Sequence, residues 1–369
     1  MSFLLFIVVL VILIVVHELG HFFVAKWFGI RVDEFGIGYP PRAFTLGTFR
    51  KTTYTINWLP FGGFVRIFGE SNNAAYSSQE RKEAFVHKPR IVQAAVLFAG
   101  IAFNILFAWL LFSATLMLGA PTAIDEADAA GVPTRLIVSS VVVGSPASAA
   151  GIVPGDEIVA LRADGESLGT LYPSAAAMFI QERGGEMLTL EYMRDAKTGE
   201  TQSVRVTPAH GVLNESPGTP AIGMAMALVA DQSLSLPAAM VEGFKNTVAA
   251  VYTVTVGLST FLFAAVTGNA DWSHVAGPIG IASLVGDASS VGLVYLLYFT
   301  ACISVNLAII NLLPVPALDG GRLLFIAIEA IRRKPMSEKI ANAVNVLGFT
   351  LLIVLMVVVT YHDIIRLFT

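Results

Sequence analysis

His17-Glu18-Leu19-Gly20-His21 lies inside an apolar run, residues 3–25, that holds no other charged side chain. A run of about 20 apolar residues is long enough to cross the hydrocarbon core of a bilayer as one helix. An ionisable group in the middle of such a helix costs about 3 kcal/mol or more. Three polar neighbours in this run therefore need a compensating partner, and a bound metal ion fits them best. The alternative is a set of satisfied polar residues at an interface between helices.

The spacing of the two histidines predicts a zinc site. Positions i and i+4 face the same side of a helix, so the imidazoles of His17 and His21 can hold one metal ion. Glu18 lies beside them and can act as a general base toward a water bound to zinc. A catalytic zinc usually has three protein ligands, so the chain should supply one more.

Asp319 is the expected third ligand, within residues 311–321 (NLLPVPALDGG). Pro314 and Pro316 should end the preceding helix and hold the following chain extended. Gly320-Gly321 then allows a turn that presents the carboxylate. The remaining histidines are poorer candidates, because they lie in loops or at the outer end of a span: His87, His210, His274 and His362.

The composition places the chain in a membrane. Hydrophobic residues make up 55% and charged residues only 14% of the 369 positions, against about a quarter charged in soluble domains, and the mean hydropathy is +0.71. A net charge of −4 gives no basic surface for nucleic acid. The single cysteine, Cys302, excludes an internal disulfide and a cysteine-rich zinc module. The length leaves room for one modest soluble domain.

Four apolar runs are predicted to cross the membrane. They lie at residues 3–25, 91–118, 291–313 and 341–361. They would form two halves of a membrane core, residues 1–118 and 289–369. A removable signal peptide is the alternative for the first run, but no basic segment precedes it and no small-residue cleavage site follows.

The charges of the connecting segments orient these spans. Residues 26–90 hold ten Lys or Arg against five Asp or Glu, and residues 319–340 hold five against three, whereas residues 119–242 hold six against fifteen. The positive-inside rule then makes the first two segments cytoplasmic and places the acidic segment and both termini outside. A fifth span at residues 247–266 would break this pattern, so residues 236–266 are expected to form an interfacial or re-entrant helix.

A soluble domain is expected at residues 134–209. Strands are predicted at residues 135–143, 188–193 and 202–206, with a helix at residues 174–182. The run GSPASAAGIVPGDEIVAL, which starts at Gly144, resembles the core signature of bacterial PDZ domains. The resemblance implies a groove between a strand and a helix that binds a peptide by strand addition. The alternative is a PDZ-shaped spacer or gate that binds no peptide.

The cytoplasmic segment, residues 31–70, is expected to contain a β-hairpin. In residues 52–67 (TTYTINWLPFGGFVRI) apolar residues alternate up to a break at residues 60–63. This part is too apolar for a solvated loop, and non-helical backbone enters a bilayer only where protein or water covers it. We therefore expect the hairpin to fold against the zinc cavity, where Gly62 and Gly63 would let a substrate backbone approach. A purely structural hairpin is the alternative.

These motifs together resemble the site-2 protease family of intramembrane zinc metalloproteases, and the bacterial RseP-type members most. HELGH, NLLPVPALDGG and the GPIGI segment at residues 277–281 carry the resemblance with the inserted PDZ-like domain. It implies zinc on His17, His21 and Asp319, with Glu18 as the catalytic base. The expected substrate-binding residues are Gly62, Gly63, Phe64, Asn306, Asn311, Pro314 and Pro316.

Two features depart from the best-known RseP proteins. Only one PDZ-like domain is found, where those proteins carry two, which bears on how substrates are admitted. Residues 101–104 (IAFN) lack the proline often found there. Asn104 is expected either to face the zinc site or to form a plain hydrogen bond between helices.

The sequence thus predicts a polytopic α-helical membrane protein with about four transmembrane helices, a membrane-reentrant β-hairpin region and an inserted extracytoplasmic PDZ domain. The resemblance implies hydrolysis of peptide bonds in transmembrane segments at the bacterial inner membrane. The implied substrates are anti-sigma factors already trimmed outside, in envelope stress signalling, and remnant signal peptides. Two alternatives are a membrane-anchored metalloprotease with its site outside the bilayer and a PDZ scaffold or zinc-binding receptor that would not need Glu18.

Overall fold

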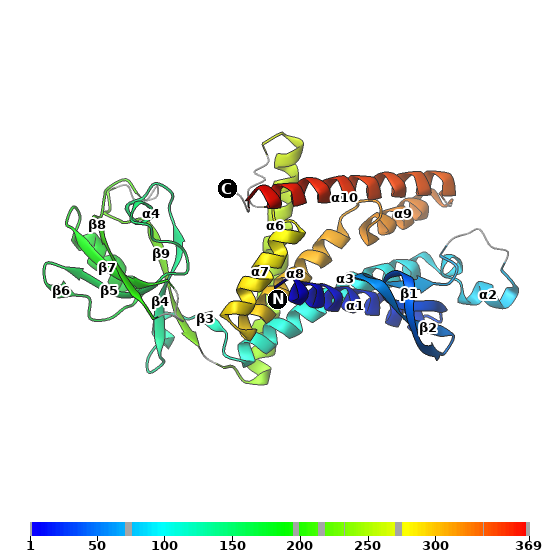
Figure 1. Ribbon diagram of the computed structural model, residues 1–369, viewed down its shortest axis with the longest axis horizontal. Helices are drawn as coiled ribbons and strands as arrows, with labels where there is room; N and C mark the ends of the chain where they lie inside the picture. The colour runs from blue at the N-terminus through cyan, green and yellow to red at the C-terminus, as the bar shows by residue number, and fades with distance from the viewer. Residues whose placement is uncertain are drawn as a thin grey trace. The chain divides into compact units, whose positions relative to one another are not determined.

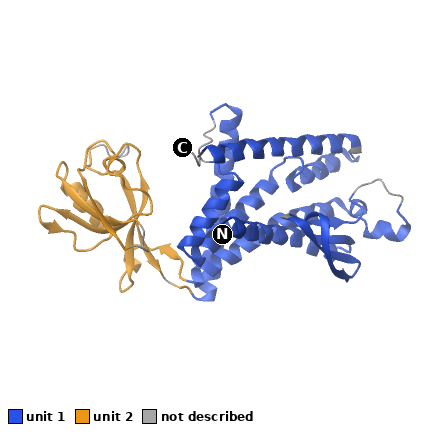
Figure 2. Ribbon diagram, viewed as in Figure 1, with its two compact units in different colours: residues 1–118, 235–369 blue, residues 119–234 orange. Residues whose placement is uncertain are grey.

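The chain forms two compact units (Figure 2). Unit 1 comprises residues 1–118 and 235–369, and unit 2 comprises residues 119–234. The computed structural model describes residues 2–70, 76–194, 199–212, 218–231, 233–269, 275–334 and 336–366.

Unit 1 is built mainly from helices (Figure 1). They are α1 (Ser2–Trp27), α2 (Ser78–Glu83), η1 (Phe85–His87), α3 (Arg90–Met117), α6 (Leu236–Val266), α7 (Pro278–Val291), α8 (Leu293–Leu312), α9 (Asp319–Arg332) and α10 (Glu338–Arg366). Five described helices, α1, α3, α6, α8 and α10, are long and apolar enough to cross a membrane. Four of them coincide with the predicted spans, and the fifth, α6, is one continuous helix of 31 residues.

The helices of unit 1 pack through apolar clusters that join α3 to its neighbours. Ala108 and Phe112 of α3 form one cluster with Val305 of α8, and the middle of α6 packs against it. The indole of Trp109 donates a hydrogen bond of 2.8 Å to the carbonyl of Met240 in α6. In Figure 1, α6 runs across the direction that α1, α3 and α10 share.

Two long strands, β1 (Val32–Phe49) and β2 (Thr52–Ile67), complete unit 1. The tight turn of this hairpin lies at Arg50-Lys51, where both residues have positive φ. The expected break at residues 60–63 is wrong as a turn between strands, because β2 continues through it. β2 bends instead, so that residues 53–56 and 63–67 both pair with residues 32–37 of β1.

The described part of unit 2 is a seven-stranded sheet with two α-helices and one 3₁₀ helix. The strand order is β3-β9-β4-β5-β7-β8, with β6 paired to β5. The elements are β3 (Pro121–Ala123), η2 (Glu126–Asp128), β4 (Thr134–Val141), α4 (Pro146–Ala149), β5 (Glu157–Ala163), β6 (Glu166–Ser167), α5 (Pro173–Glu182), β7 (Leu188–Met193), β8 (Thr201–Val206) and β9 (Met224–Asp231). The predicted strands and helix are present to within two residues. The strands β3, β5, β6 and β9 were not predicted. The alanine-rich run of β9 lacks the β-branched pattern of a strand.

The PDZ-like run owes its local structure to two polar side chains. Ser145 caps α4 by accepting a hydrogen bond from the backbone N–H of Ser148. Asp156, 1% exposed, accepts bonds from the backbone N–H of Val153 and from the guanidinium of Arg194 at 2.9 Å. The Asp156 carboxylate raises the pKa of the Arg194 guanidinium.

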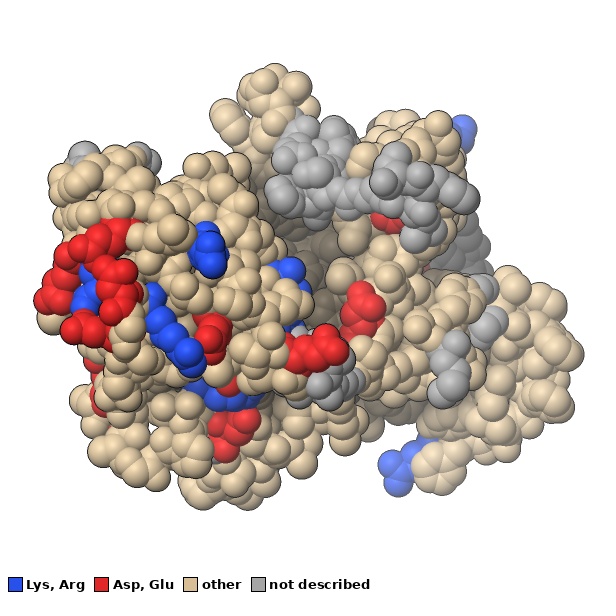
Figure 3. Space-filling model, turned by 60° about the vertical axis from the view of Figure 1, so that its left-hand side comes forward, with Lys and Arg blue, Asp and Glu red and all other residues tan. Residues whose placement is uncertain are grey.

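The charged side chains visible in Figure 3 gather on one part of the surface, while the rest of the visible surface is largely uncharged. Unit 2 contains ion pairs such as Arg135 with Asp231 and Arg183 with Glu166. The long helices of unit 1, by contrast, expose apolar side chains such as Phe244, Leu351 and Val357. Lipid tails would cover such surfaces, as the sequence predicts for a membrane core.

Candidate metal centre

Three side chains from two ends of the chain converge in unit 1. Nε2 of His17 lies 2.9 Å and Nε2 of His21 lies 3.2 Å from Oδ2 of Asp319. The two Nε2 atoms lie 3.1 Å apart. Both histidines are 7% exposed. Among the described residues this is the one group of three or more His, Cys, Asp or Glu side chains whose ligand atoms lie close enough to hold a metal ion.

The orientation of His21 fits a metal ligand. Its Nδ1 lies 2.8 Å from the backbone carbonyl of Val96 in α3, which can only accept a hydrogen bond. A neutral imidazole that donates through Nδ1 has an unprotonated Nε2. That nitrogen faces the second imidazole and the carboxylate, which suits a cation between them. Two ligands of a tetrahedral zinc lie roughly 3.3 Å apart for bonds of about 2.0 Å, close to the separations found here.

Asn104 of α3 lies against the other histidine. Its Nδ2 is 3.3 Å from Nδ1 of His17, and the residue is fully buried. Its Oδ1 has no hydrogen-bond partner among the described residues. The two ends of a side-chain amide can be exchanged by turning it over, and Oδ1 would then accept the proton of Nδ1. This leaves Nε2 of His17 free for a metal, so the residues present fit zinc.

Close packing of α1 on α3 brings these groups together. Gly20 lies against the backbone at Ala99 and Gly100, and a Cβ at Gly20 would collide with the carbonyl of Ala99. A Cβ at Gly100 would lie 2.5 Å from Nε2 of His21 and 2.7 Å from Cε1 of His17. Both positions therefore need glycine because the helices approach closely. Gly100 was not among the predicted site residues, although the spacing from Gly100 to Asn104 places both residues on one face of a helix.

The loop between α8 and α9 presents Asp319. α8 ends at Leu312, before Pro314, as predicted. The expectation that Gly320-Gly321 forms the turn is wrong, because the positive φ lies at Ala317, at 76°. The two glycines begin α9, where a Cβ on either would collide with backbone carbonyls of residues 312–315. They are needed for close packing of α9 on its own loop.

Glu18 lies between the histidines and the sheet. A Cβ at Gly63 in β2 would lie 3.5 Å from Cγ of Glu18. The backbone of β2 therefore passes directly beside the expected base. Residues 63–67 pair with β1 on one side only, and no other described strand pairs with their outer edge.

The other expected substrate-binding residues lie around the cluster to different degrees. Gly62, at φ 129°, is covered by the ring of Tyr39, and the ring of Phe64 covers Gly36. Asn306 is exposed and donates to the carbonyl of Cys302 in its own helix, at 2.9 Å. The remaining three lie in and before the loop that leads to Asp319: Asn311 is half-buried, Pro314 is exposed and Pro316 is half-buried.

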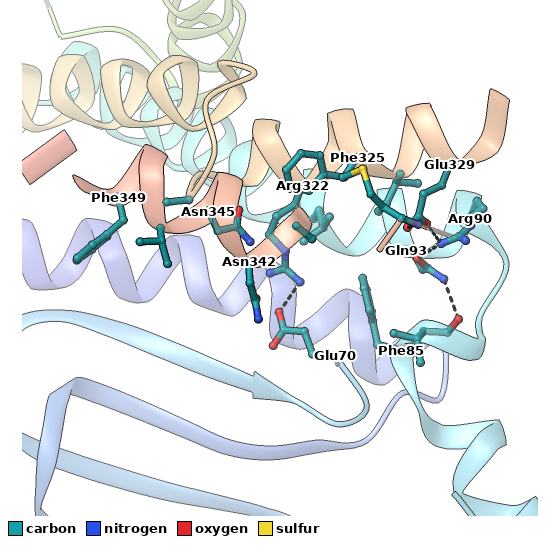
Figure 4. A pocket seen from close by; sticks show the side chains of 17 residues that line it. Glu70, Phe85, Arg90, Gln93, Arg322, Phe325, Glu329, Asn342, Asn345 and Phe349 are labelled. Carbon is teal, nitrogen blue, oxygen red and sulfur yellow. Dashed lines mark hydrogen bonds and ion pairs between the residues drawn. The ribbon is translucent and has the colours of Figure 1, made fainter. Parts of the chain in front are cut away.

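A cavity of about 720 Å³ lies beside α9 (Figure 4). An ion pair joins Arg322 of α9 to Glu70, which follows β2, and a second of 2.5 Å joins Glu329 of α9 to Arg90, the first residue of α3. Figure 4 shows Asn345 of α10 beside Arg322. Both α9 residues lie on the helix that begins with Asp319, so these pairs help to hold that helix against α3 and against the segment that follows β2.

The histidines that the sequence analysis set aside take no part in the cluster. The His87 ring contacts Tyr76 edge-on, and His210 lies near the carbonyl of Gly218 in unit 2. His362 is near the end of α10. His274 falls outside the described residues.

Comparison with known proteins agrees with this chemistry. The model of peptidase family M50 matches residues 5–355. A protein of Clostridium perfringens is 36% identical over 354 residues, which cover 96% of this chain and 95% of the relative. Relatives from Brucella suis (29% identical, 97% of this chain and 93% of the relative) and Staphylococcus aureus (30% identical, 98% of each) are also similar. All three carry the name "putative zinc metalloprotease".

Proposed function

The chain belongs to peptidase family M50, the site-2 protease family of zinc metalloproteases, and on that premise we propose that it hydrolyses peptide bonds within membrane-spanning segments. The single observation that carries this proposal is the position of the ligand cluster. His17 and His21 lie about two-thirds of the way along α1, a helix of 26 residues whose other charged side chains are Glu18 beside them and Lys26 in the last turn. A metalloprotease with a site in water would not need its ligands in a helix of this kind.

His17, His21 and Asp319 would hold the zinc, and Glu18 would serve as the general base. When bound, zinc lowers the pKa of a coordinated water toward about 7 and polarises the substrate carbonyl. Glu18 would accept the proton of the attacking water and later return a proton to the leaving amine. Asn104 and the Val96 carbonyl would keep the two imidazoles oriented for the metal.

β2 offers a means to hold the substrate. A peptide bond in a helix is shielded by its neighbours, so cleavage requires an extended backbone. The outer edge of residues 63–67 can pair with such a segment by strand addition, and it passes beside Glu18 through Gly63. Gly62, Phe64, Asn306, Asn311, Pro314 and Pro316 are proposed to contact the substrate around this edge.

The proposed topology has four spans, α1, α3, α8 and α10, with both termini outside. The direction of α6 in Figure 1, across α1, α3 and α10, supports an interfacial or re-entrant helix. The ligand cluster would then lie in the cytoplasmic half of a bacterial inner membrane, and β1 and β2 would re-enter the bilayer from the cytoplasm. Unit 2 would be a PDZ domain outside, and the proposed substrates are remnant signal peptides and trimmed anti-sigma factors of envelope stress signalling.

Reconstitution with a single-span substrate tests the proposal. The protein is purified with zinc, placed in liposomes with a tagged substrate that lacks an external domain, and compared with Glu18→Gln. We expect the native protein to cleave and Glu18→Gln to be slower by about 100-fold or more, with the zinc content of both proteins unchanged. Glu186→Gln, an exposed glutamate of unit 2, is the matched control and should cleave normally.

Mass spectrometry of the products then locates the cut. A scissile bond within the apolar segment of the substrate is expected. Equal cleavage by the native protein and by Glu18→Gln would contradict the role of Glu18. A cut confined to the flanking polar segments would contradict cleavage within the membrane.

A further inference from the structure

β3 is attached to unit 2 as an added strand. Pro121, Thr122 and Ala123 pair antiparallel with residues 229–231 at the end of β9. The next residue, Ile124, continues the ladder by donating a hydrogen bond of 3.0 Å to the carbonyl of Leu228. This short strand therefore runs along the edge of β9 toward the start of that strand.

The rest of that edge is open. Residues 224–230 of β9 pair with β4 on one side, but no described strand pairs with residues 224–227 on the side where β3 lies. Backbone groups point to alternate sides of a strand. Because the carbonyl of Leu228 faces β3, those of Met224 and Met226 face the same edge. An extended chain that continued from Ile124 would find these groups available.

The chain leaves the edge instead and is anchored to α5. One carboxylate oxygen of Glu126 accepts a bond of 2.7 Å from the backbone N–H of Ser174, and the other accepts a bond of 2.5 Å from its hydroxyl. Tyr172, at the N-cap of α5, makes no side-chain cap, so Glu126 supplies it. These two donors hold the pKa of the Glu126 carboxyl below its usual range.

We propose that residues 121–128 are a strap that occupies part of a peptide-binding edge and competes with an extended peptide for β9. The peptide would run antiparallel to β9, as β3 does, would pair along residues 224–231 in place of the strap and would carry a carboxylate for the start of α5. This proposal rests on the proposed function, because it names the segment through which unit 2 would sense an extended substrate. When such a peptide binds the edge of β9 and the start of α5, the strap is displaced from both.

The anchor is tested by amide hydrogen exchange on the whole protein in detergent. Glu126→Ala removes the cap of α5, so the amides of residues 122–124 and 174–176 should exchange about fivefold faster. Asp128→Ala also removes one negative charge, but Asp128 is exposed and lies two residues further along the chain. This control variant should leave the exchange unchanged. Equal exchange in the native protein and in Glu126→Ala would overturn the anchor.

Competition is tested with the strap itself as the probe. Ala123 and Val229 are direct partners, and cysteines at these positions, in a Cys302→Ser background, would lock the strap onto β9 when oxidised. A labelled peptide of residues 121–128 (PTAIDEAD) is added at millimolar concentration. It should bind Glu126→Ala more tightly than the native protein, and the oxidised double-cysteine protein not at all until it is reduced.

The competition would be overturned if the peptide bound the oxidised and reduced double-cysteine proteins equally well. It would also be overturned if the peptide did not bind Glu126→Ala. Neither measurement depends on cleavage. A negative result for the strap would therefore not bear on the proposed proteolysis. If the protein proved not to cleave its substrate, the exchange and binding measurements would still test the strap.

Discussion

Two aspartates of unit 1, Asp363 and Asp319, differ in the groups that face their carboxylates. Asp363, near the end of α10 and 4% exposed, accepts hydrogen bonds from the backbone N–H groups of Gly277 and Gly280, at 3.0 and 2.9 Å. These groups are unpaired donors at the first turn of α7. Asp319 instead faces Nε2 of two imidazoles, at 2.9 and 3.2 Å.

The difference separates a cluster held by backbone hydrogen bonds from a candidate metal site. Around Asp363 the backbone supplies the donors, and a Cβ on Gly277 or Gly280 would lie too close to the carboxylate. The glycines of the GPIGI segment are thus explained by packing on Asp363. Around Asp319, three atoms that can each act as a metal ligand converge, and a cation bound among them would compensate the buried carboxylate.

Loss of the Asp319 carboxylate should have the largest effect on zinc. Asp319→Ala removes one of three ligands, so zinc affinity should fall by more than about 100-fold, beyond the range typical of residues that only support a ligand. Competition with a chelating dye measures the affinity. Asp363→Ala is the paired variant and should keep native affinity; similar losses in both variants would show that the two clusters are not independent.

A methyl group at Gly100 should break the same cluster without removing a ligand. In Gly100→Ala the new Cβ would meet both imidazoles, as close as 2.5 Å to Nε2 of His21. Displacement of a catalytic group by about 1 Å can cost about 100-fold in rate, and we expect a loss of that size in substrate cleavage. Gly257→Ala is the control, because nothing lies within 4 Å of its Cβ position in α6. Native activity in Gly100→Ala would contradict the tight fit of α3 on the histidines.

Asn104 also bears on the comparison, because a hydrogen bond to Nδ1 of His17 would give its unpartnered Oδ1 a donor. Asn104→Ala should lower zinc affinity by about 10- to 100-fold, as for other groups that orient a metal-binding histidine. Asn104→Asp keeps an acceptor for the proton of Nδ1 and should retain more of the affinity than the alanine variant. Equal affinities for Asn104→Ala and the native protein would reduce Asn104 to a hydrogen bond between helices.

The sequence predicted those features that depend on local patterns. The spacing of His17 and His21 lies within one helix, and apolar runs mark the long helices regardless of their partners. The role of Asn104 stayed open because its partner His17 lies 87 residues away, and one sequence does not reveal such a pairing. The role of Asp363 was not predicted for the same reason, because its partners Gly277 and Gly280 precede it by more than 80 residues.

Other features were misjudged because several structures satisfy one local pattern. Gly320-Gly321 was assigned to a turn, which glycine favours, but close packing also requires glycine, and the positive φ fell on Ala317. Residues 60–63 contain Pro and two Gly, which are typical of turns, yet β2 only bends there. β9 carries too many alanines for its period to distinguish strand from helix.

The smallest effect on zinc, and a clear effect on stability, is expected at the other aspartate. Asp363→Ala leaves two buried N–H groups at the start of α7 without acceptors, at about 1–3 kcal/mol for each, so the thermal unfolding midpoint in detergent should fall. Asp287→Ala, an exposed aspartate on α7, makes the same change of charge and should leave the midpoint unchanged. Because α10 meets α7 at Asp363, loss of zinc in Asp363→Ala would mean that the packing of these two helices also sets the geometry of the ligands. A lower unfolding midpoint with unchanged zinc affinity would establish that Asp363 contributes to stability independently of the ligand cluster at Asp319.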